Sequence, residues 1–534
     1  MPPKTRTDAG AGVISGPPLD VLSGLLDAER LDDLLSRAAR TAPVRYALRS
    51  PDGGLTYAEL DARVSAFASA LRAVAGGPGE TIALTAGLDL TFPVTYYGIA
   101  RSSNVSVIVN PLLPDDRLVH LLATSRVTAA VVTPDVCRRL AAMRERLPDL
   151  RELVLTHREP GLDAGHLATV DELIRRDLPP VPADGDEPAC LQFTSGTTGA
   201  PKAVRLSHRN LTVNAAQTVH GNRLSASSVL FNYLPVFHPM HLNAGVAAAA
   251  TIVLYAGQDL AEAVRTAARY GATHFYSLPV QLARLAVDPR LPGLSVPTLQ
   301  AVLSGGSALA PRAAAALSDH FRVPVVQGYG LAETSPSTHL GDLDRPKPGS
   351  CGVLVPGTDC RIVDIDTGTV RPRGARGEIQ VRGPQLMLGY LGRDRAKDIS
   401  PDGWFATGDV GYVDEEGFLF VVDRIKDVFK CDNWLVAPSG IEQVLAGHPA
   451  VRDCVVLDRP DAFHGAVGHA LVVADGDVEP AELTAFVNAR VPSYEHLHGV
   501  DLIAEIPRSP TGKVPRRELR AWLLARLKTT DPVK

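Results

Sequence analysis

The sequence has little of several features that define whole classes of protein. Its 534 residues include six cysteines, none of which has C-x-x-C spacing or a His nearby at a metal-ligand interval. This pattern favours free thiols in a reducing cytoplasm over a disulfide framework or a zinc site. The formal net charge of −5 is mild, so charge gives no reason to expect nucleic acid or an anionic membrane as a partner. The cysteines are Cys137, Cys190, Cys351, Cys360, Cys431 and Cys454.

Long apolar runs and internal repeats are also lacking. The longest apolar stretch, around Gly245–Gly257, is well short of the ~20 residues that a membrane helix needs. No fixed-period repeat is visible, which argues against solenoids and propellers. Residues 1–20 have no apolar core of signal-peptide length, and we predict a disordered tail there. A soluble, cytoplasmic protein is therefore expected.

The length and composition of the chain are those of a globular protein with several domains. Hydrophobic residues make up 45% and charged residues 21% of the chain, as is usual for globular proteins. Domains of roughly 100–200 residues imply two to four units. From about Leu31 to Val325, helical stretches alternate with β-branched runs, which predicts layered α/β architecture with largely parallel sheets. The predicted strands include Thr81–Leu84, Val105–Val109, Ala129–Val132, Leu153–Leu155, Thr251–Leu254 and Ala301–Leu303.

The pattern changes after Gly349. Short strand-like runs separated by Gly, Pro and Asp predict a smaller β-rich subdomain. Beyond Arg424, about 110 residues form a compact α+β unit, and the boundary is predicted at Asp423–Asp427. We expect a large N-terminal body (21–423) and a small mobile C-terminal lid (424–534). The lid's predicted elements are helices Ser439–Ala446 and Glu479–Arg490, strands Val451–Leu457, His469–Ala474 and Val500–Ile506, and a last helix whose apolar face is Leu519, Trp522, Leu523 and Leu527.

The strongest local signal is the segment Thr194–Lys202, which reads TSGTTGAPK. Small hydroxyl residues alternate with glycines directly after a short apolar run, so several N–H and O–H donors can face one point, as a polyphosphate requires. Lys202 adds a positive charge. No G-K-[S/T] closes the loop, so it is not a Walker A loop. The alternative interpretation of the loop taken alone is a flexible surface turn.

This segment resembles the signature of the ANL superfamily, which comprises acyl- and aryl-CoA synthetases, adenylation domains and luciferases. The resemblance covers about residues 30–525. Further motifs resemble those of the superfamily and follow in its order: Leu55–Leu60, Leu234–His238, Ser304–Leu309, Gln327–Thr334, Gly403–Asp409, Asp423–Asp427 and Pro507–Val514.

The resemblance implies an ATP-dependent acid–thiol ligase that forms acyl-AMP, releases pyrophosphate and then transfers the acyl group to CoA. Lys513 would stabilise the charge that develops at the α-phosphate, although it could also be one more cation in a basic stretch. Glu333 and Thr334 would bind Mg²⁺, and Asp409 and Arg424 would hold the ribose. The implied catalytic residues are Lys513, Glu333, His238 and Lys202. The implied nucleotide contacts are Thr194, Ser195, Gly196, Thr197, Thr198, Gly199, Lys202, Gly306, Ser307, Ala308, Gln327, Gly328, Tyr329, Gly330, Thr334, Asp409, Arg424 and Lys513.

The same resemblance places an acid pocket at five positions: His238, His241, Gly305, Gly330 and Pro336. The alternative for His238 is a purely structural role, as a packed histidine at a strand end. Asn243 follows closely in HPMHLNAG, and with His241 it predicts a polar pocket rim. That rim favours an aryl or functionalised acid over a plain long chain.

The motifs that would serve thioester formation depart from the family pattern. Lys426 occupies the hinge about which the small domain would turn. The loop after it has Asn433 where relatives usually have glycine, and Gly440 and the segment Tyr494–Leu497 differ too, as does Ala203 beside the phosphate loop. A carrier-protein thiol, or nitrite activation for diazotisation of an arylamine, therefore stays open as an alternative to CoA. A non-catalytic nucleotide-binding protein is a further alternative. Neither the acid nor the oligomeric state follows from the sequence.

Overall fold

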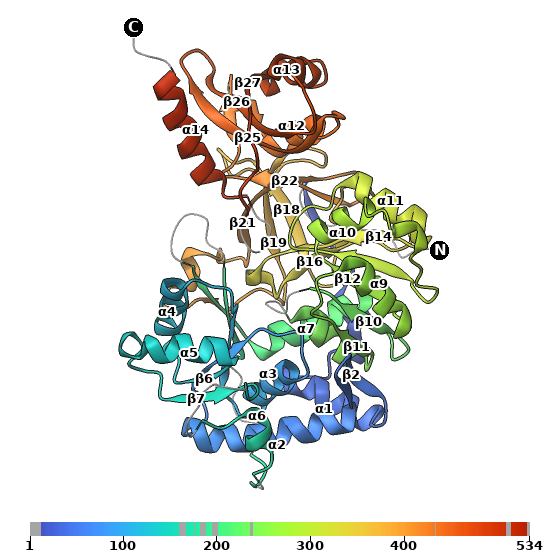
Figure 1. The fold of residues 1–534 in the computed structure, drawn as a ribbon, viewed down its shortest axis with the longest axis vertical. Helices are drawn as coiled ribbons and strands as arrows, with labels where there is room; N and C mark the ends of the chain where they lie inside the picture. Colours follow the sequence, from blue (N-terminus) through green and yellow to red (C-terminus); the bar gives the residue numbers. More distant parts are fainter. Residues whose placement is uncertain are drawn as a thin grey trace. The chain divides into compact units, whose positions relative to one another are not determined.

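The computed structural model describes residues 12–159, 167–176, 178–181, 188–194, 201–234, 239–432, 434–508 and 514–530, with side chains to residue 527. The described chain separates into two compact units (Figure 1). The first comprises Val13–Cys360 and Val381–Phe405, and the second comprises Arg361–Gln380 and the chain from Ala406 onward. The domain boundary at Asp423–Asp427 stays a prediction.

A seven-stranded sheet of the first unit has the order β14-β13-β12-β10-β11-β2-β3. All neighbouring strands are parallel except β2 and β3. Apolar side chains of three helices, α9, α10 and α11, pack on one face, and α8 packs on the other, where Gly245 lies against Ile252 and Leu230. The elements are β2 (Tyr46–Ser50), β3 (Gly53–Thr56), β10 (Val229–Asn232), β11 (Thr251–Leu254), β12 (His274–Ser277), β13 (Ala301–Ser304), β14 (Val325–Gln327), α8 (Met240–Ala247), α9 (Leu260–Arg269), α10 (Pro279–Ala286) and α11 (Pro311–Phe321).

A second seven-stranded sheet has the order β20-β9-β8-β5-β4-β6-β7. Its strands are parallel from β8 to β7, and β9 and β20 are added antiparallel. Helices α4 and α5 bury their apolar side chains against one face. The elements are β4 (Thr81–Thr85), β5 (Val105–Val109), β6 (Ala129–Val132), β7 (Glu152–Leu155), β8 (Cys190–Phe193), β9 (Ala203–Leu206), β20 (Gly389–Tyr390), α4 (Asp115–Thr124) and α5 (Pro134–Ala142).

The motif Leu55–Leu60 begins a long helix by reciprocal capping. Thr56 Oγ1 accepts a hydrogen bond from the Glu59 N–H at 3.2 Å, and the Glu59 carboxylate accepts from the Thr56 N–H at 2.8 Å. This capping box satisfies N–H groups that the first helical turn leaves unpaired. The helix is α2 (Tyr57–Ala75), and the other helices of the unit are α1 (Leu31–Thr41), α3 (Thr91–Arg101), α6 (Val170–Ile174) and α7 (His208–Gly221).

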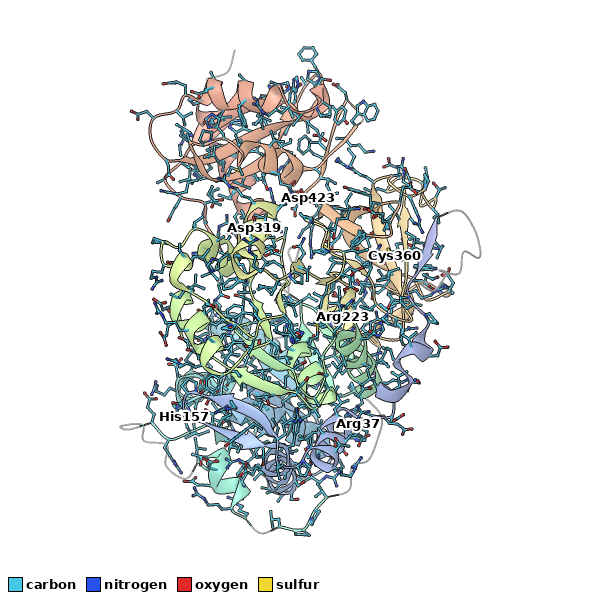
Figure 2. All side chains as sticks on the ribbon, turned by 90° about the vertical axis from the view of Figure 1, so that its right-hand side faces the viewer. Arg37, His157, Arg223, Asp319, Cys360 and Asp423 are labelled. Atoms are coloured by element: carbon cyan, nitrogen blue, oxygen red, sulfur yellow. The ribbon has the colours of Figure 1, made fainter. Side chains whose placement is uncertain are left out.

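The chain continues through two small sheets, ordered β15-β16-β17 and β1-β18-β19-β21-β22. Cys360 of β18, labelled in Figure 2, is buried, and all six cysteines are free thiols, as the sequence predicts. The strands are β1 (Val13–Ser15), β15 (Tyr329–Gly330), β16 (Ser337–Leu340), β17 (Val353–Leu354), β18 (Asp359–Val363), β19 (Gly377–Arg382), β21 (Phe405–Val413) and β22 (Leu419–Arg424).

The C-terminal part of the second unit folds around another sheet, which has the order β24-β23-β26-β25 and in which β27 also pairs with β26. Buried residues of α12 and α13 pack on one face, and those of α14 pack on the other. The elements are β23 (Phe429–Cys431), β24 (Trp434–Val436), β25 (Val451–Asp461), β26 (Gly465–Ala474), β27 (Leu497–Leu502), α12 (Pro438–Leu445), α13 (Pro480–Asn488) and α14 (Arg516–Thr530). The layered α/β fold with a small α+β C-terminal part is confirmed.

Three local predictions are wrong. The tail predicted over residues 1–20 is ordered from residue 12, because β1 pairs with β18 and the Gly16 N–H donates to the Thr358 carbonyl at 2.8 Å. The last predicted strand lies at Leu497–Leu502, since pairing with β26 sets its register. Trp522 of α14 is 42% exposed, whereas Leu523 is fully buried, so its ring lies outside the predicted apolar face. Among the described residues, no helix is both long and apolar enough to cross a membrane.

Candidate active site

The predicted acid and nucleotide segments begin at one edge of the first sheet. β10, β12, β13 and β14 are parallel and aligned, with Asn232 opposite Tyr276 and Ser304 opposite both Ser277 and Gln327. Three motifs follow directly from β10, β13 and β14, so they leave from the carboxyl ends of neighbouring strands. That edge of an open parallel sheet is where ligands usually bind.

Glycines keep space open at this edge. Apart from the glycine itself and its two chain neighbours, no atom of the described residues lies within 4 Å of where a Cβ would stand on Gly305 or Gly306. Gly306 has φ of +90°, a conformation that favours glycine. A Cβ on Gly330 would stand 1.8 Å from the carbonyl oxygen of Pro336. Two predicted pocket residues, Gly330 and Pro336, are thus in direct backbone contact, and only glycine fits the first position.

Gln327 supports the segment that follows β13. Its Oε1 accepts a hydrogen bond from the Leu309 N–H at 2.7 Å, and its Nε2 donates to the Ser350 carbonyl at 3.0 Å. The buried amide therefore fixes the end of the Ser304–Leu309 segment. The nucleotide contacts predicted for Gln327, for Ser307 and Ala308, and for Gly328 and Tyr329 stay predictions.

The glycine-rich segment is held by a hairpin. β8 and β9 pair antiparallel up to Phe193 opposite Ala203. Beyond that pair, the Thr194 N–H donates to the Lys202 carbonyl at 3.0 Å. The predicted phosphate contacts Ser195 to Gly199 lie outside the described residues. The hairpin nevertheless places the two ends of the segment, Thr194 and Lys202, side by side.

Lys202, Tyr390 and Glu333 form what we term the lysine–tyrosine–glutamate cluster. Lys202 Nζ lies over the ring of Tyr390, 4.5 Å from its centroid, and Tyr390 Oη donates to Glu333 Oε1 at 2.7 Å. Burial and the Glu333 carboxylate raise the pKa of Tyr390 well above its usual range. The hydroxyl therefore stays protonated and donates to the carboxylate. The cluster joins the predicted phosphate lysine to the predicted metal ligand.

Tyr390 was missed by the sequence reasoning. It belongs to the two-residue strand β20, which pairs with β9 with Tyr390 opposite Val204. The Met387 N–H also donates to the Glu333 carbonyl at 2.9 Å. The one available signal was the apolar run LMLGYL, which contains Tyr390 as its one aromatic residue, and such a run does not reveal its partner strand.

Thr334 closes the turn that presents Glu333. Its hydroxyl donates to the Leu331 carbonyl at 3.1 Å and contacts the Pro336 carbonyl, and it accepts from the Leu331 N–H at 3.0 Å. Thr334 has no exposed surface, whereas Glu333 is 7% exposed. The carboxylate of Glu333, a hard oxygen donor, suits Mg²⁺. The metal role predicted for Thr334 stays a prediction.

The predicted acid pocket is partly described. His241 of α8 packs edge-on against the Tyr276 ring, with centroids 4.5 Å apart. Asn243, two residues later on the helix, points elsewhere: it is 2% exposed and accepts a hydrogen bond from Tyr97 Oη at 3.0 Å. The prediction that Asn243 lines a polar rim is wrong, because residues two apart on a helix face different sides. His238 lies outside the described residues. Tyr276 was not predicted from sequence.

The second unit brings together the predicted ribose pair. Asp409 and Arg424 are opposite each other on β21 and β22, and Arg424 Nε lies 2.9 Å from Asp409 Oδ1. Asp409 is 3% exposed, and its N–H donates to the Thr407 hydroxyl at 3.1 Å. The arginine offsets the cost of burying the carboxylate. The adjacency is a fact of the structure, and the ribose contact stays a prediction.

The predicted hinge and lysine segments are both anchored within the second unit. Ile425–Asp427, with Lys426 at its centre, forms a turn between β22 and β23. Asp423, labelled in Figure 2, accepts hydrogen bonds from the N–H and hydroxyl of Ser439 at 3.0 and 2.9 Å. Ser439 lies in the first turn of α12, so the strand that enters the turn is tied to the start of this helix.

Lys513 lies outside the described residues, but its flanks are held by two ion pairs, of which the second is bidentate. Arg508 Nη2 binds both carboxylate oxygens of Asp453 at 2.8 and 2.7 Å. Arg516 binds Glu442 Oε1 and Oε2 at 2.7 and 2.8 Å. A bidentate pair is geometrically specific. Arg508 and Arg516 are therefore engaged in ion pairs on either side of the segment that carries Lys513.

Comparison with known families gives two matches along the chain. Residues 35–391 match the family "AMP-binding enzyme", and residues 440–513 match the "AMP-binding enzyme C-terminal domain". Curated relatives include 4-coumarate–CoA ligase 5 of Oryza sativa subsp. japonica, 32% identical with 88% of this chain and 90% of the relative covered. Another is feruloyl-CoA synthase of Amycolatopsis sp., 31% identical with 91% and 97% covered.

Solved structures share the fold. The anthranilate CoA ligase AuaEII, in complex with anthranoyl-AMP, superimposes with a TM-score of 0.85 at 23% identity, covering 95% of this chain and 99% of that one. The o-succinylbenzoate CoA synthetase MenE of Bacillus subtilis, in complex with its acyl-adenylate intermediate, has a TM-score of 0.80 at 25% identity, with 91% and 97% covered.

Proposed function

Because the chain belongs to the AMP-binding enzyme family, within the adenylate-forming ANL superfamily, we propose that the acid it activates is an aryl acid. The protein is an ATP-dependent, AMP-forming acid–thiol ligase: it converts an organic acid to the acyl-AMP with release of pyrophosphate and transfers the acyl group to CoA. The class of acid and the roles of individual residues are the proposal.

The observation that carries the aryl assignment is the open space beside Gly305 and Gly306, at the carboxyl edge of β13. Gly305 and Gly306 present backbone and no side chain to that space. The ring pair of His241 and Tyr276 comes from the neighbouring α8 and β12. A planar ring can lie against bare peptide planes and meet aromatic edges in offset or edge-to-face contact. The relatives named for coumarate, ferulate and anthranilate act on aromatic acids, which agrees with this assignment.

In the first half-reaction, an oxygen of the acid's carboxylate attacks the α-phosphorus of ATP, and the bond to the pyrophosphate oxygen breaks. Lys202 binds the leaving phosphates from the end of the glycine-rich segment, with its ammonium held over the Tyr390 ring. Tyr390 orients Glu333 by donating to one carboxylate oxygen. Glu333 would hold a Mg²⁺ ion, which would offset the negative charge of the phosphates.

The second unit supplies the remaining groups. Asp409 accepts hydrogen bonds from the ribose hydroxyls, and Arg424 fixes the orientation of that carboxylate. Lys513 stabilises the charge that redistributes between the acid oxygen and the α-phosphate. In the second half-reaction, the sulfur of CoA attacks the acyl carbon, AMP leaves with the former acyl oxygen, and the thiol proton is released. The turn that contains Lys426 is the proposed hinge for the change between the two reactions.

The test is ATP–pyrophosphate exchange over a matched panel of acids. Benzoates and cinnamates, with and without ring hydroxyl or amino groups, are compared with straight-chain acids of equal carbon number. The expected result is exchange at least about tenfold faster with aryl acids, equivalent to ~1.4 kcal/mol of discrimination. Equal or faster exchange with the straight-chain acids would overturn the aryl assignment.

Product analysis tests the acceptor. CoA, a phosphopantetheinylated carrier protein and an arylamine with nitrite are each added to the enzyme with the best acid and ATP. We expect an acyl-CoA thioester, as the relatives named as CoA ligases suggest. Transfer to the carrier protein in preference to CoA would reassign the acceptor and leave the adenylation proposal intact. We further propose the cytoplasm as the compartment, because six free thiols suit a reducing environment.

A further inference from the structure

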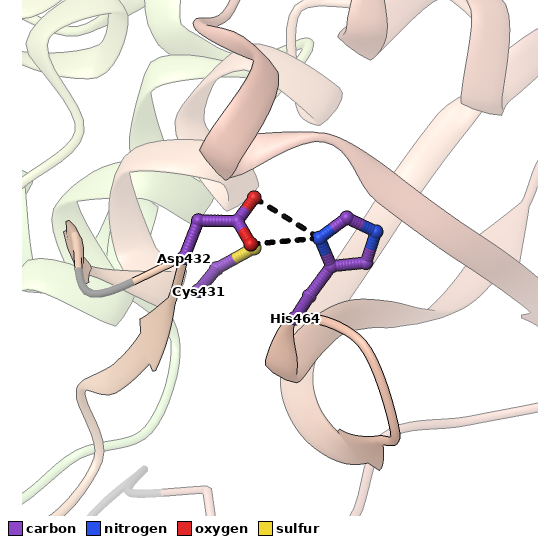
Figure 3. Close-up of side chains that lie close together, drawn as sticks. All are labelled: Cys431, Asp432 and His464. Carbon is purple, nitrogen blue, oxygen red and sulfur yellow. Dashed lines mark hydrogen bonds and ion pairs between the residues drawn. The ribbon is translucent and has the colours of Figure 1, made fainter.

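Three chemically different side chains converge at one end of the C-terminal sheet. Donor atoms of Cys431, Asp432 and His464 all lie within 4.8 Å of one another. Figure 3 shows Nδ1 of His464 turned toward the Asp432 carboxylate, with Cys431 Sγ beside the same carboxylate. Within the described part of the chain, this is the one group of three such side chains. We term it the cysteine–aspartate–histidine cluster.

Backbone pairing brings the cluster together. Cys431 ends β23 and pairs with Gly465, the first residue of β26, so His464 stands beside Asp432. The Asp432 N–H donates to the His464 carbonyl at 3.1 Å. The Asp461 carboxylate then accepts from the N–H of His464 at 3.0 Å and fixes the turn. Each ligand is therefore carried by hydrogen-bonded backbone, which limits the movement that binding would require.

The distances suit a small cation with little rearrangement. His464 Nδ1 is 2.9 and 3.0 Å from the two carboxylate oxygens of Asp432. Bonds of ~2.0–2.3 Å place tetrahedral Zn²⁺ ligands roughly 3.3–3.8 Å apart. The distance between the carboxylate and the imidazole nitrogen must therefore lengthen slightly. The distances from the sulfur to these two donors, at most 4.8 Å, must shorten by up to about 1 Å. Side-chain rotation at the Cys431 and Asp432 positions can provide both movements.

The donor set specifies the class of metal. A thiolate and an imidazole favour borderline or soft divalent ions, whereas Mg²⁺ and Ca²⁺ require oxygen ligands. We propose that Cys431, Asp432 and His464 bind a divalent transition-metal ion, with Zn²⁺ the best match. Three protein ligands leave one tetrahedral position open to water or to an exogenous thiol, as in zinc sites that are not closed.

A bound metal would join two segments that are 33 residues apart in the sequence. Cys431 and Asp432 lie at the β23–β24 hairpin, and His464 lies in the turn between β25 and β26. Zn²⁺ would therefore cross-link them and stabilise the C-terminal part of the second unit by mass action. This inference does not rest on the proposed acid, since the site is separate from every residue assigned to adenylation.

Metal binding to the full-length protein is the test. Protein is freed of metal with a chelator, kept reduced with a phosphine and titrated with Zn²⁺ while bound metal is counted by mass spectrometry. We expect one Zn²⁺ per chain and a raised unfolding temperature. Cys431→Ser, Asp432→Asn and His464→Gln should each weaken binding roughly tenfold or more. The matched controls Cys454→Ser and His496→Gln should bind as the wild type does.

Cobalt identifies the ligand directly. Co²⁺ in the same site should give a thiolate-to-metal charge-transfer band in the near ultraviolet that vanishes in Cys431→Ser. Mg²⁺ and Ca²⁺ at the same concentrations should not raise the unfolding temperature. The inference is overturned if Zn²⁺ does not bind stoichiometrically, or if it binds with unchanged affinity and an unchanged cobalt band in Cys431→Ser. The first result leaves His464 and Asp432 as an ordinary surface ion pair.

Discussion

The lysine–tyrosine–glutamate cluster of the first unit and the cysteine–aspartate–histidine cluster of the second differ in how they hold charge. In the first, a carboxylate that is 7% exposed receives a hydrogen bond from a tyrosine whose ionisation burial suppresses. In the second, Asp432 is exposed and His464 is half-buried, and both can exchange partners with water. Buried charge depends on each partner atom, whereas exposed charge is screened and its pairs are weak. Single-atom changes should therefore matter far more in the first cluster.

The two clusters also differ in how well the surrounding motifs match the superfamily. The phosphate segment around the first is intact apart from Ala203, and the loop around the second has Asn433 in place of the usual glycine. Two members of the second cluster, Cys431 and Asp432, directly precede that change. No residue of this cluster is assigned to adenylation, so it can accept a metal ligand set, whereas changes in the buried cluster are expected to impair the first half-reaction.

The largest expected effect is at Lys513, the cation that would act on the reacting atoms themselves. Lys513→Ala should slow acyl-AMP formation by roughly 10²–10³-fold, the range for removal of one group that stabilises transition-state charge. ATP binding should remain measurable, because other residues hold the nucleotide. Pyrophosphate exchange reports the rate, and Arg517→Ala is the matched control on the neighbouring exposed arginine. Exchange at the wild-type rate would refute the catalytic assignment.

The second-largest effect is expected from a change of charge within the lysine–tyrosine–glutamate cluster. Glu333→Gln keeps the side-chain shape but removes the negative charge, so exchange should fall by about 10²-fold and require more Mg²⁺. The rate is measured over a series of Mg²⁺ concentrations, with the exposed Glu415→Gln as control. An unchanged Mg²⁺ dependence would show that Glu333 does not hold the metal.

A substitution at the proposed hinge should slow thioester formation and leave adenylation nearly unchanged. Lys426→Pro fixes φ in the turn between β22 and β23 and costs about 3 kcal/mol where the backbone must change, which would slow thioester formation by roughly 10²-fold. Adenylation should be nearly unaffected. Lys426→Ala, which removes the charge but leaves the backbone free, should keep both reactions. Thioester formation at the normal rate in Lys426→Pro would exclude a swing at this turn.

Removal of the Tyr390 hydroxyl tests whether a single atom matters in the first cluster. Tyr390→Phe deletes the hydrogen bond to Glu333, and bonds to charged acceptors contribute about 1.5–3 kcal/mol, so exchange should fall by roughly tenfold or more. Because the pKa of Tyr390 is raised, the wild-type activity should show no loss from its ionisation below pH ~10. Similar activity in Tyr390→Phe and wild type at every Mg²⁺ concentration would make the contact merely structural.

The smallest effect concerns a buried neutral histidine outside both clusters. His208 Nδ1 accepts a hydrogen bond from the Leu31 N–H at 3.1 Å, and burial lowers the pKa of His208 to about 3. Below pH ~6.5 the unfolded chain binds a proton that the folded chain does not, so stability falls as pH falls, by at most about 1.4 kcal/mol per unit from this group. Denaturation midpoints from pH 7 to 4 should show a flatter slope in His208→Asn. An equal slope in the two proteins would mean that other titrating groups dominate the pH dependence of stability.

Some features of this protein follow from local sequence. β5, β6 and β11 were predicted to the residue, because β-branched runs bounded by turn residues favour strands regardless of their neighbours. The residues proposed to carry the nucleotide chemistry were selected for a similar reason. Phosphate and ribose binding require particular side chains at fixed spacing within short segments, as at Thr194–Lys202.

Other features depended on which strands pair. Tyr390 reaches Glu333 because β20 adds to β9. Cys431 reaches His464 because β23 lies beside β26, although the sequence places no histidine at a metal-ligand interval. Trp522 is exposed although it lies between buried leucines, since contact with β25 and β26 selects which stripe of α14 is covered. Local propensity is fixed by neighbours in the chain, whereas strand order and packing are fixed by burial summed over the whole fold.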